Sequence, residues 1–103
     1  MEIKTEKKSD SITMKIDGEL TIYSVSDFRK SFINDTAHSR EITINLSHIS
    51  RFDTAGFQSL LLARRSAESG GKSIRFTDPS QAVQRFFAAY NETIEDWTVH
   101  ARG

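Results

Sequence analysis

The residues of this chain that are best suited to chemistry stand in the stretch Asp53-Thr54-Ala55-Gly56. Thr54 carries a hydroxyl at the expected start of a helix, where the helix dipole tolerates an added negative charge. A phosphate on that hydroxyl would add about −1.5 to −2 charges without unfolding the domain, although Asp53 beside it would repel the phosphate. The stretch is therefore a candidate phosphorylation site that would alter anything docking on its surface.

The same four residues also have a purely structural interpretation. Asp53 or Thr54 could be the N-cap of the helix, accepting a hydrogen bond from a backbone N–H that would otherwise lack a partner. Gly56 would permit a close approach of the backbone to a neighbouring element. The two interpretations require the same turn, so the residue types alone leave both open.

No other combination of residues indicates catalysis or metal binding. His38, His48 and His100 are dispersed and form no recognised metal spacing, and the chain contains no cysteine. No phosphate-binding loop, GxGxxG or GxSxG motif occurs, and we interpret Arg64 and Arg65 as a solvated helix face. We therefore expect no catalytic residues, no metal, no cofactor and no enzymatic activity.

Composition narrows the class of protein. With 103 residues, 37% apolar and 27% charged, the chain is expected to form a single globular domain over residues 1–103. Lys and Arg number 14 and Asp and Glu also number 14, so no basic excess favours nucleic acid or a membrane surface. No apolar run resembles a signal peptide or reaches membrane length, and we expect a reducing, cytoplasmic setting.

Thr54 must be positioned by a strand before it and a helix after it, and the hydrophobic pattern predicts both. Alternation of apolar and polar residues indicates strands, and apolar residues at helical spacing indicate helices. We expect strands over 3–8, 12–22, 41–49 and 73–77, helices over 24–35, 55–71 and 78–91, and a last short strand around 97–99.

This order, β-β-α-β-α-β-α-(β), predicts an α/β fold. A hairpin through Ser9-Asp10-Ser11 opens the chain, and single helices then join consecutive strands by right-handed crossovers. The expected architecture is a mixed, largely parallel sheet of four to five strands packed with three to four helices.

Three helix ends carry recognisable signals. Ser24 is the expected N-cap of the first helix. Gly70 or Gly71 should end the second helix, because glycine suits a left-handed C-cap. In the third helix we expect Asp78 as the N-cap and Pro79 at the first helical position.

The helix after Thr54 is apolar over an unusually wide arc. Leu60, Leu61 and Leu62 are consecutive, so they spread over about 200° of a helix with 3.6 residues per turn. Phe57, Leu60, Leu61 and Arg64 form one stripe, and Leu62 lies off it. Either the helix is wedged between two neighbouring elements, or part of its apolar surface is covered by another protein.

The order of these motifs resembles a known family. The resemblance rests on the stretch LSHISRFDTAGFQSLLLARRSAESGGKSIRFTDPSQAVQRFF and extends back through IDGELTIYSVSDFRKSF, covering roughly residues 12 to 90. This stretch is similar to the STAS domain (sulphate transporter and anti-sigma factor antagonist), in particular to its stand-alone bacterial antagonist members. The shared pattern is a strand, a loop, Asp-Ser/Thr-Ser/Ala-Gly, an apolar helix, Gly-Lys or similar, a strand and a further helix.

The resemblance implies a small α/β domain without catalytic activity of its own. In such proteins the hydroxyl residue after the aspartate is phosphorylated by a partner serine/threonine kinase, often the anti-sigma factor itself, and a phosphatase reverses the step. Carried over, Thr54 is the phosphoacceptor, Asp53 the adjacent acid and Gly56 the close-approach glycine. The unmodified form would bind the anti-sigma factor and so release a sigma factor.

The resemblance also leaves a second role open. Related single-domain proteins serve as constitutive adaptor subunits of lipid-transport ABC systems, of signalling scaffolds or of chemotaxis complexes, in which Thr54 would be a contact residue only. Both roles use the same surface and imply neither nucleic-acid binding nor direct membrane insertion. The expected partner-binding residues are Asp53, Thr54, Ala55, Gly56, Phe57, Gln58 and Leu61.

Overall fold

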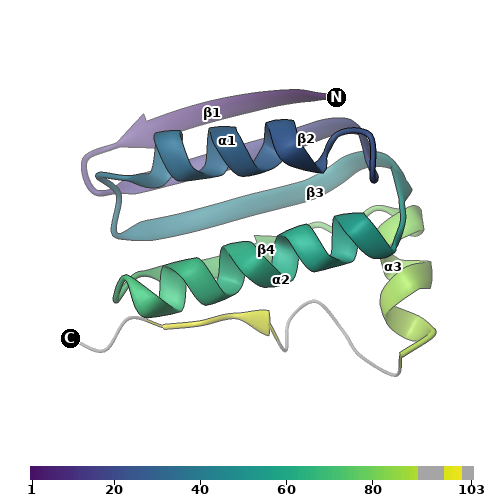
Figure 1. Ribbon diagram of the computed structural model, residues 1–103. Helices are drawn as coiled ribbons and strands as arrows, with labels where there is room; N and C mark the ends of the chain where they lie inside the picture. The colour runs from purple at the N-terminus through teal and green to yellow at the C-terminus, as the bar shows by residue number, and fades with distance from the viewer. Residues whose placement is uncertain (91–96, 101–103) are drawn as a thin grey trace.

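The computed structural model describes residues 1–90 and 97–100 of the chain. Within them the elements follow the expected order β-β-α-β-α-β-α (Figure 1). The elements are β1 (Glu2–Lys8), β2 (Ser11–Leu20), α1 (Val25–Thr36), β3 (Glu41–Phe52), α2 (Thr54–Ser69), β4 (Ser73–Thr77) and α3 (Gln81–Ala88).

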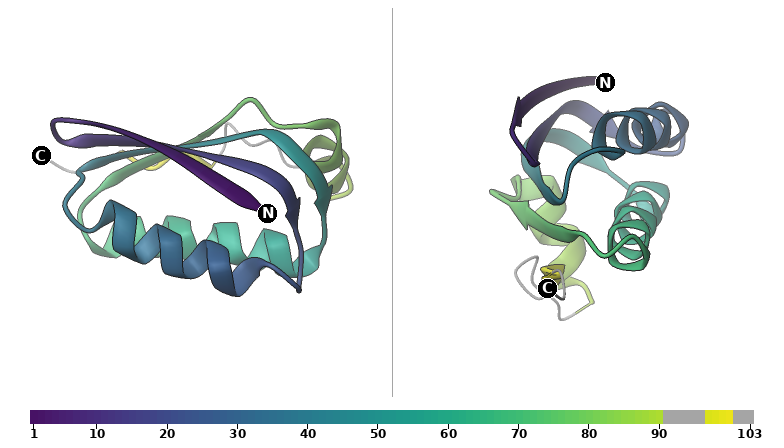
Figure 2. Two further views of the ribbon diagram at one scale, coloured as in Figure 1. Left: turned by 90° about the horizontal axis from the view of Figure 1, so that it is seen from above. Right: turned by 90° about the vertical axis from the view of Figure 1, so that its left-hand side faces the viewer.

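The four strands form one mixed sheet in the order β1-β2-β3-β4. β1 and β2 pair antiparallel through the predicted hairpin, whereas β2, β3 and β4 pair in parallel. The two crossovers proceed in the same direction across the sheet, and both are expected to be right-handed, so α1 and α2 lie on the same face (Figure 2). The predicted mixed, largely parallel sheet is confirmed.

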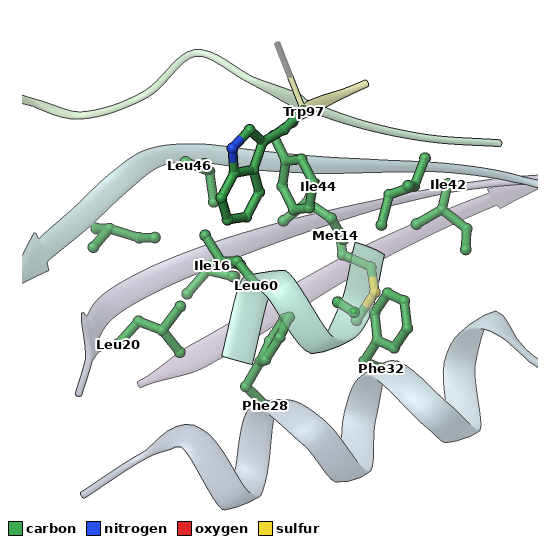
Figure 3. Packing of buried hydrophobic residues seen from close by; sticks show 14 of the residues in the cluster. Met14, Ile16, Leu20, Phe28, Phe32, Ile42, Ile44, Leu46, Leu60 and Trp97 are labelled. Atoms are coloured by element: carbon green, nitrogen blue, oxygen red, sulfur yellow. The ribbon is translucent and has the colours of Figure 1, made fainter. Parts of the chain in front are cut away.

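The core lies between this sheet and the two crossover helices. Parallel register places Ile12 beside Ile42 and Ile42 beside Ile74, so buried side chains form rows across the strands. Phe28 and Phe32 point from α1 toward the sheet, as Figure 3 shows. The opposite face of the sheet carries polar side chains, and no helix in the described part of the chain covers it.

β3 is longer than expected because its alternation is interrupted rather than ended. The register with β2 shifts between Lys15, paired with Asn45, and Asp17, paired with His48. This irregularity returns Ile49 to the buried face, and the pairing then continues to Leu20 and Phe52. The strand therefore runs directly to Asp53, and the short loop expected after residue 49 does not exist.

The start of α1 differs from the prediction. Ser24 stands at the N-cap position, but its side chain makes no capping hydrogen bond. Its hydroxyl instead donates to the carbonyl oxygen of Glu19 and accepts from the N–H of Thr21, at 2.7 and 3.0 Å. Ser24 thus closes the turn that precedes the helix.

The start of α3 also differs. The N-cap is Ser80, whose hydroxyl accepts from the N–H of Val83, and not Asp78, which is exposed with a positive φ of 52°. The N–H of Ser80 donates to the carbonyl oxygen of Leu46, which ties this residue to β3 and makes the next residue the first of the helix. Pro79 accordingly precedes the cap instead of opening the helix.

The end of α2 and the C-terminal segment follow the prediction in part. α2 ends at Ser69 with Gly70 as its C-cap, and Gly71 has the positive φ of 69° that favours glycine. The expected last strand is a single antiparallel bridge, in which Val99 exchanges two backbone hydrogen bonds with Ile74. Trp97 is buried beside it. The third helix was predicted to run to Asn91, which lies outside the described residues, but α3 already ends at Ala88 with Ala89 as its C-cap.

Candidate functional site

Asp53 joins three elements at the start of α2. Its Oδ1 accepts a hydrogen bond from the N–H of Gly56 at 2.9 Å, so Asp53 and not Thr54 is the N-cap. Its Oδ2 accepts from the N–H of Ile22 at 3.0 Å, in the turn between β2 and α1. One half-buried carboxylate therefore fixes both the first turn of α2 and the neighbouring turn.

Thr54 is the first residue of α2 and is exposed. Its hydroxyl makes no hydrogen bond with any residue of 1–90 or 97–100, because Asp53 already performs the capping. The side chain is therefore not needed by the local backbone. It projects from the positive end of a 16-residue helix.

Gly56 lies on the buried side of the same turn. A Cβ at this position would overlap the carbonyl oxygen of Leu20 and would lie 3.0 Å from Cδ1 of Phe52. Only glycine lets α2 approach the end of β2 so closely. Its side of the helix faces the interior, so it positions Thr54 and contributes no surface of its own.

Two apolar residues that the sequence analysis did not select lie next to this site. Ile22 and Tyr23, in the turn between β2 and α1, are 63% and 95% exposed. The hydrogen bond from the N–H of Ile22 to Asp53 holds that turn beside Thr54. The sequence pattern predicted a strand that continued to Ile22, so Ile22 was expected inside the sheet. The strand ends at Leu20, and Ile22 lies in the turn instead.

The remaining predicted partner residues separate onto two flanks of α2. Ala55 and Gln58 lie on the flank that faces α1. Phe57 and Leu61 lie on the other flank, where both are half-buried against the core. The expected partner residues therefore do not form one continuous face.

The flank with Phe57 is closed by aromatic side chains. The Phe57 ring lies 5.2 Å from the ring of Phe86 and 5.1 Å from that of Trp97, measured between centroids. Arg64 is half-buried there, with its Nε donating to the carbonyl oxygen of Trp97 at 3.2 Å and its guanidinium 5.8 Å from the indole. The interpretation of Arg64 as a solvated residue was wrong, because Trp97 covers it, whereas Arg65 is exposed.

The flank with Gln58 borders an open groove between α1 and α2, with a volume of about 670 Å³. Leu62 and Ile33 lie on opposite sides of it and are 51% and 53% exposed. The first interpretation of the leucine-rich helix, packing between neighbouring elements, is confirmed for the flank with Phe57. α2 is packed against neighbours on one flank and exposes apolar surface on the other.

Titratable side chains do not converge elsewhere in the described residues. His38, in the turn after α1, His48, in β3, and His100, in the C-terminal segment, are all exposed. Within residues 1–90 and 97–100 no three His, Cys, Asp or Glu side chains are grouped so that they could hold a metal ion. The helices of this part of the chain include none that is long and apolar enough to cross a membrane.

Comparison with known families gives a match over most of the chain. Residues 3–93 match the family model described as Mlab, STAS domain. This range includes the four strands except for Glu2, the three helices and the Asp53-Thr54 turn. The matched unit thus contains the sheet and its helices, whereas Trp97 and Val99 follow it in the chain.

Several solved structures share this fold at low sequence identity. The Bacillus cell fate determinant SpoIIAA in its phosphorylated form superposes with a TM-score of 0.71 and 18% identity, over 98% of this chain and 92% of that one. RsbS from Moorella thermoacetica gives a TM-score of 0.72 and 19% identity, over 91% and 81%. An antisigma-factor antagonist STAS domain from Rhodobacter sphaeroides gives 0.66 and 20%, over 80% and 94%.

Proposed function

Because the chain belongs to the STAS domain family, we propose that it is a phosphorylation-controlled protein-interaction switch. In this proposal it is an anti-sigma factor antagonist of a bacterial partner-switching cascade, it has no enzymatic activity, and Thr54 is the phosphoacceptor. The observation that carries the proposal is the exposed Thr54 hydroxyl, which makes no hydrogen bond in the described structure and stands beside exposed apolar residues. Similar structures include SpoIIAA in its phosphorylated form, which supports such a role.

The unmodified protein docks its partner around the start of α2. Ile22 and Tyr23 supply apolar surface, and Thr54 contributes a small neutral group at its edge. Burial of exposed apolar side chains of this size favours association. When the anti-sigma factor binds here, the sigma factor that it held is released.

Phosphorylation reverses this docking. The partner kinase transfers the γ-phosphoryl group of ATP to the Thr54 oxygen, ADP leaves, and the hydroxyl proton passes to the kinase. The helix dipole stabilises the added charge, but the carboxylate of Asp53 is committed to the N–H groups of Gly56 and Ile22 and remains a neighbouring negative charge. A partner that covers the phosphate must bury a charge without a counter-ion, which weakens the complex.

Kinase reactions test this proposal directly. The protein and its Thr54→Ala variant are incubated with ATP and each serine/threonine kinase encoded beside the gene, and intact masses are measured. We expect one added phosphate on the wild type and none on the variant. An unchanged wild-type mass with every kinase, or equal labelling of the variant, would contradict the assignment of Thr54.

A constitutive adaptor subunit of a larger assembly is the second candidate function. The observation that favours it is the apolar surface that stays exposed without any modification, at Ile22, Tyr23 and along the groove. Affinity purification from the native host distinguishes the two functions. An adaptor brings down the same complex as wild type and as Thr54→Asp, whereas a switch loses its partner in the Thr54→Asp variant.

A further inference from the structure

The groove between α1 and α2 is built from both helices along most of their length. The two helices run in the same direction on one face of the sheet (Figures 1 and 2). Phe28, Phe32 and Ala63 are buried lining residues, and Ile33 and Leu62 are half-exposed ones. Two apolar side chains thus border a concave surface that no element in residues 1–90 or 97–100 covers.

Charge around this groove has one sign. Arg29 of α1 and Arg65 of α2 are both exposed lining residues, and the lining set within the described residues contains no Asp or Glu. The chain as a whole has equal numbers of acidic and basic residues, so this local excess is not a consequence of composition. An occupant of the groove is therefore favoured if it combines apolar side chains with carboxylates.

The shape of the groove suits a helix. Its α2 wall extends from Ala55 to Ser69, which corresponds to about 21 Å at 1.5 Å per residue. A partner helix of about four turns matches this length. The walls also contain hydroxyls and an amide (Ser26, Gln58, Ser59, Ser66 and Ser69), which can hydrogen-bond polar side chains but not an acyl chain.

We propose that the α1–α2 groove docks an acidic amphipathic helix of a partner protein. The apolar stripe of that helix packs against Ile33 and Leu62, and its carboxylates face Arg29 and Arg65. This inference rests on the proposed function in one respect: it assumes that the protein acts by binding another protein, and it names the part of that protein that binds. It does not require that Thr54 is phosphorylated.

The position of Thr54 connects the groove to the switch. Ala55 follows Thr54 directly, Gln58 lies one helical turn later, and both line the groove. A phosphate on Thr54 would stand at the end of the groove and repel an acidic helix there, with a range of about 8 Å at physiological ionic strength. Phosphorylation of Thr54 would therefore weaken the partner's contact with Ile22 and Tyr23 and also its contact with the groove.

Two synthetic helical peptides of sixteen residues test the proposal. They share one leucine stripe at i, i+3, i+4 and i+7, and their flanking positions are all Glu in one peptide and all Lys in the other. Each is titrated into the unphosphorylated ¹⁵N-labelled protein, and amide shifts are followed. We expect shifts confined to the groove walls and an affinity about tenfold higher for the Glu peptide.

A charge-reversed variant supplies the decisive comparison. Arg29→Glu with Arg65→Glu should reverse the preference, so that the Lys peptide binds more tightly. Lys30→Glu with Lys8→Glu, at exposed positions that do not line the groove, produces the same change in net charge and should keep the Glu preference. The amide spectra of both variants report whether the fold is retained.

Several outcomes would overturn the inference. Equal affinity for both peptides, no binding of either peptide, or amide shifts outside the groove would each contradict it. The same holds if the groove amides shift with dodecanoate, a probe for an acyl-chain ligand, or on self-association of the protein, but not with the Glu peptide. Because the titration uses unphosphorylated protein, its failure leaves the Thr54 proposal standing. An unlabelled Thr54 in the kinase reactions would equally leave the groove proposal standing.

Discussion

The two flanks of α2 show how one helix serves the core and the surface at once. On one flank Phe57 packs among the two phenylalanine rings of α3 and the indole of Trp97, with centroid separations of 5.1 to 5.6 Å. On the other flank Ala55 and Gln58 face α1 across an open groove. The first flank contributes to the core, and the second leaves apolar side chains exposed.

The difference between the flanks arises from what stands opposite each one. α3 and the C-terminal segment bring large aromatic side chains that fill the space beside Phe57. α1 presents Ser26, Arg29 and Ile33 to the groove, and Ile33 stays 53% exposed there. A leucine is therefore core or surface according to the neighbouring element and not according to its own type.

Truncation of two leucines that lie two residues apart is the strongest test of this comparison. Leu60→Ala should lower the free energy of unfolding by about 3 kcal/mol, because a fully buried side chain leaves a cavity. Leu62→Ala should lower it by about 0.5 kcal/mol or less, because its side chain is half in water. Urea unfolding followed by circular dichroism measures both, and equal losses would remove the distinction between the flanks.

Substitution of Gly56 tests the contact that places both flanks on the sheet. Gly56→Ala should cost about 2 to 3 kcal/mol, because the added methyl overlaps the carbonyl oxygen of Leu20 and forces α2 outward. Gly70→Ala is the matched control, since its φ of −83° suits alanine and its Cβ would lie 3.4 Å from the nearest atom. In thermal unfolding, the melting temperature should fall strongly for Gly56→Ala and stay near that of the wild type for Gly70→Ala.

Removal of the Asp53 carboxylate should have a smaller effect on the same end of α2. Asp53→Ala loses the N-cap and the hydrogen bond to Ile22 together, for a cost of about 1 to 2 kcal/mol. Asp53→Asn retains one acceptor oxygen and should recover about half of this loss. Faster hydrogen exchange at the Ile22 and Gly56 amides in the alanine variant would confirm the connection, and unchanged exchange would contradict it.

Thr54→Ala should have the smallest effect on stability. The Thr54 hydroxyl makes no hydrogen bond in the described structure, so the free energy of unfolding should change by no more than about 0.5 kcal/mol. The same variant should abolish phosphorylation by the partner kinase. A loss of stability as large as that of Asp53→Ala would instead indicate that Thr54 serves the backbone.

Local patterns predicted most of the fold because they report interactions within one element or between adjacent ones. The alternation of Ile42, Ile44 and Leu46 predicted a half-buried strand, and residues 73–77 form a strand with the expected bounds. Errors occurred where distant contacts decide the geometry. Ser80 and not Asp78 caps α3 because its N–H is bound to Leu46, which is remote in sequence.

The candidate site divides in the same way. The order of residue types in Asp53-Thr54-Ala55-Gly56 was sufficient to predict a hydroxyl at the start of a helix. It also predicted a glycine where the helix approaches a neighbouring element closely. It could not select Ile22 and Tyr23, because their place beside Thr54 depends on a hydrogen bond across 31 residues. Nor could it separate Phe57 from Gln58, since helical spacing does not specify the neighbour on each flank.

By itself, the sequence determined the alternation of strands and helices, the position of a hydroxyl at the start of α2 and the absence of cysteine chemistry. Tertiary structure alone decided that Asp53 is the cap, that the Thr54 hydroxyl is therefore uncommitted, and that within residues 1–90 and 97–100 one flank of α2 is packed while the other borders a groove. The physical reason is that hydrophobic periodicity encodes which side chains leave water. Which groups they then meet depends on elements that only the folded chain brings together.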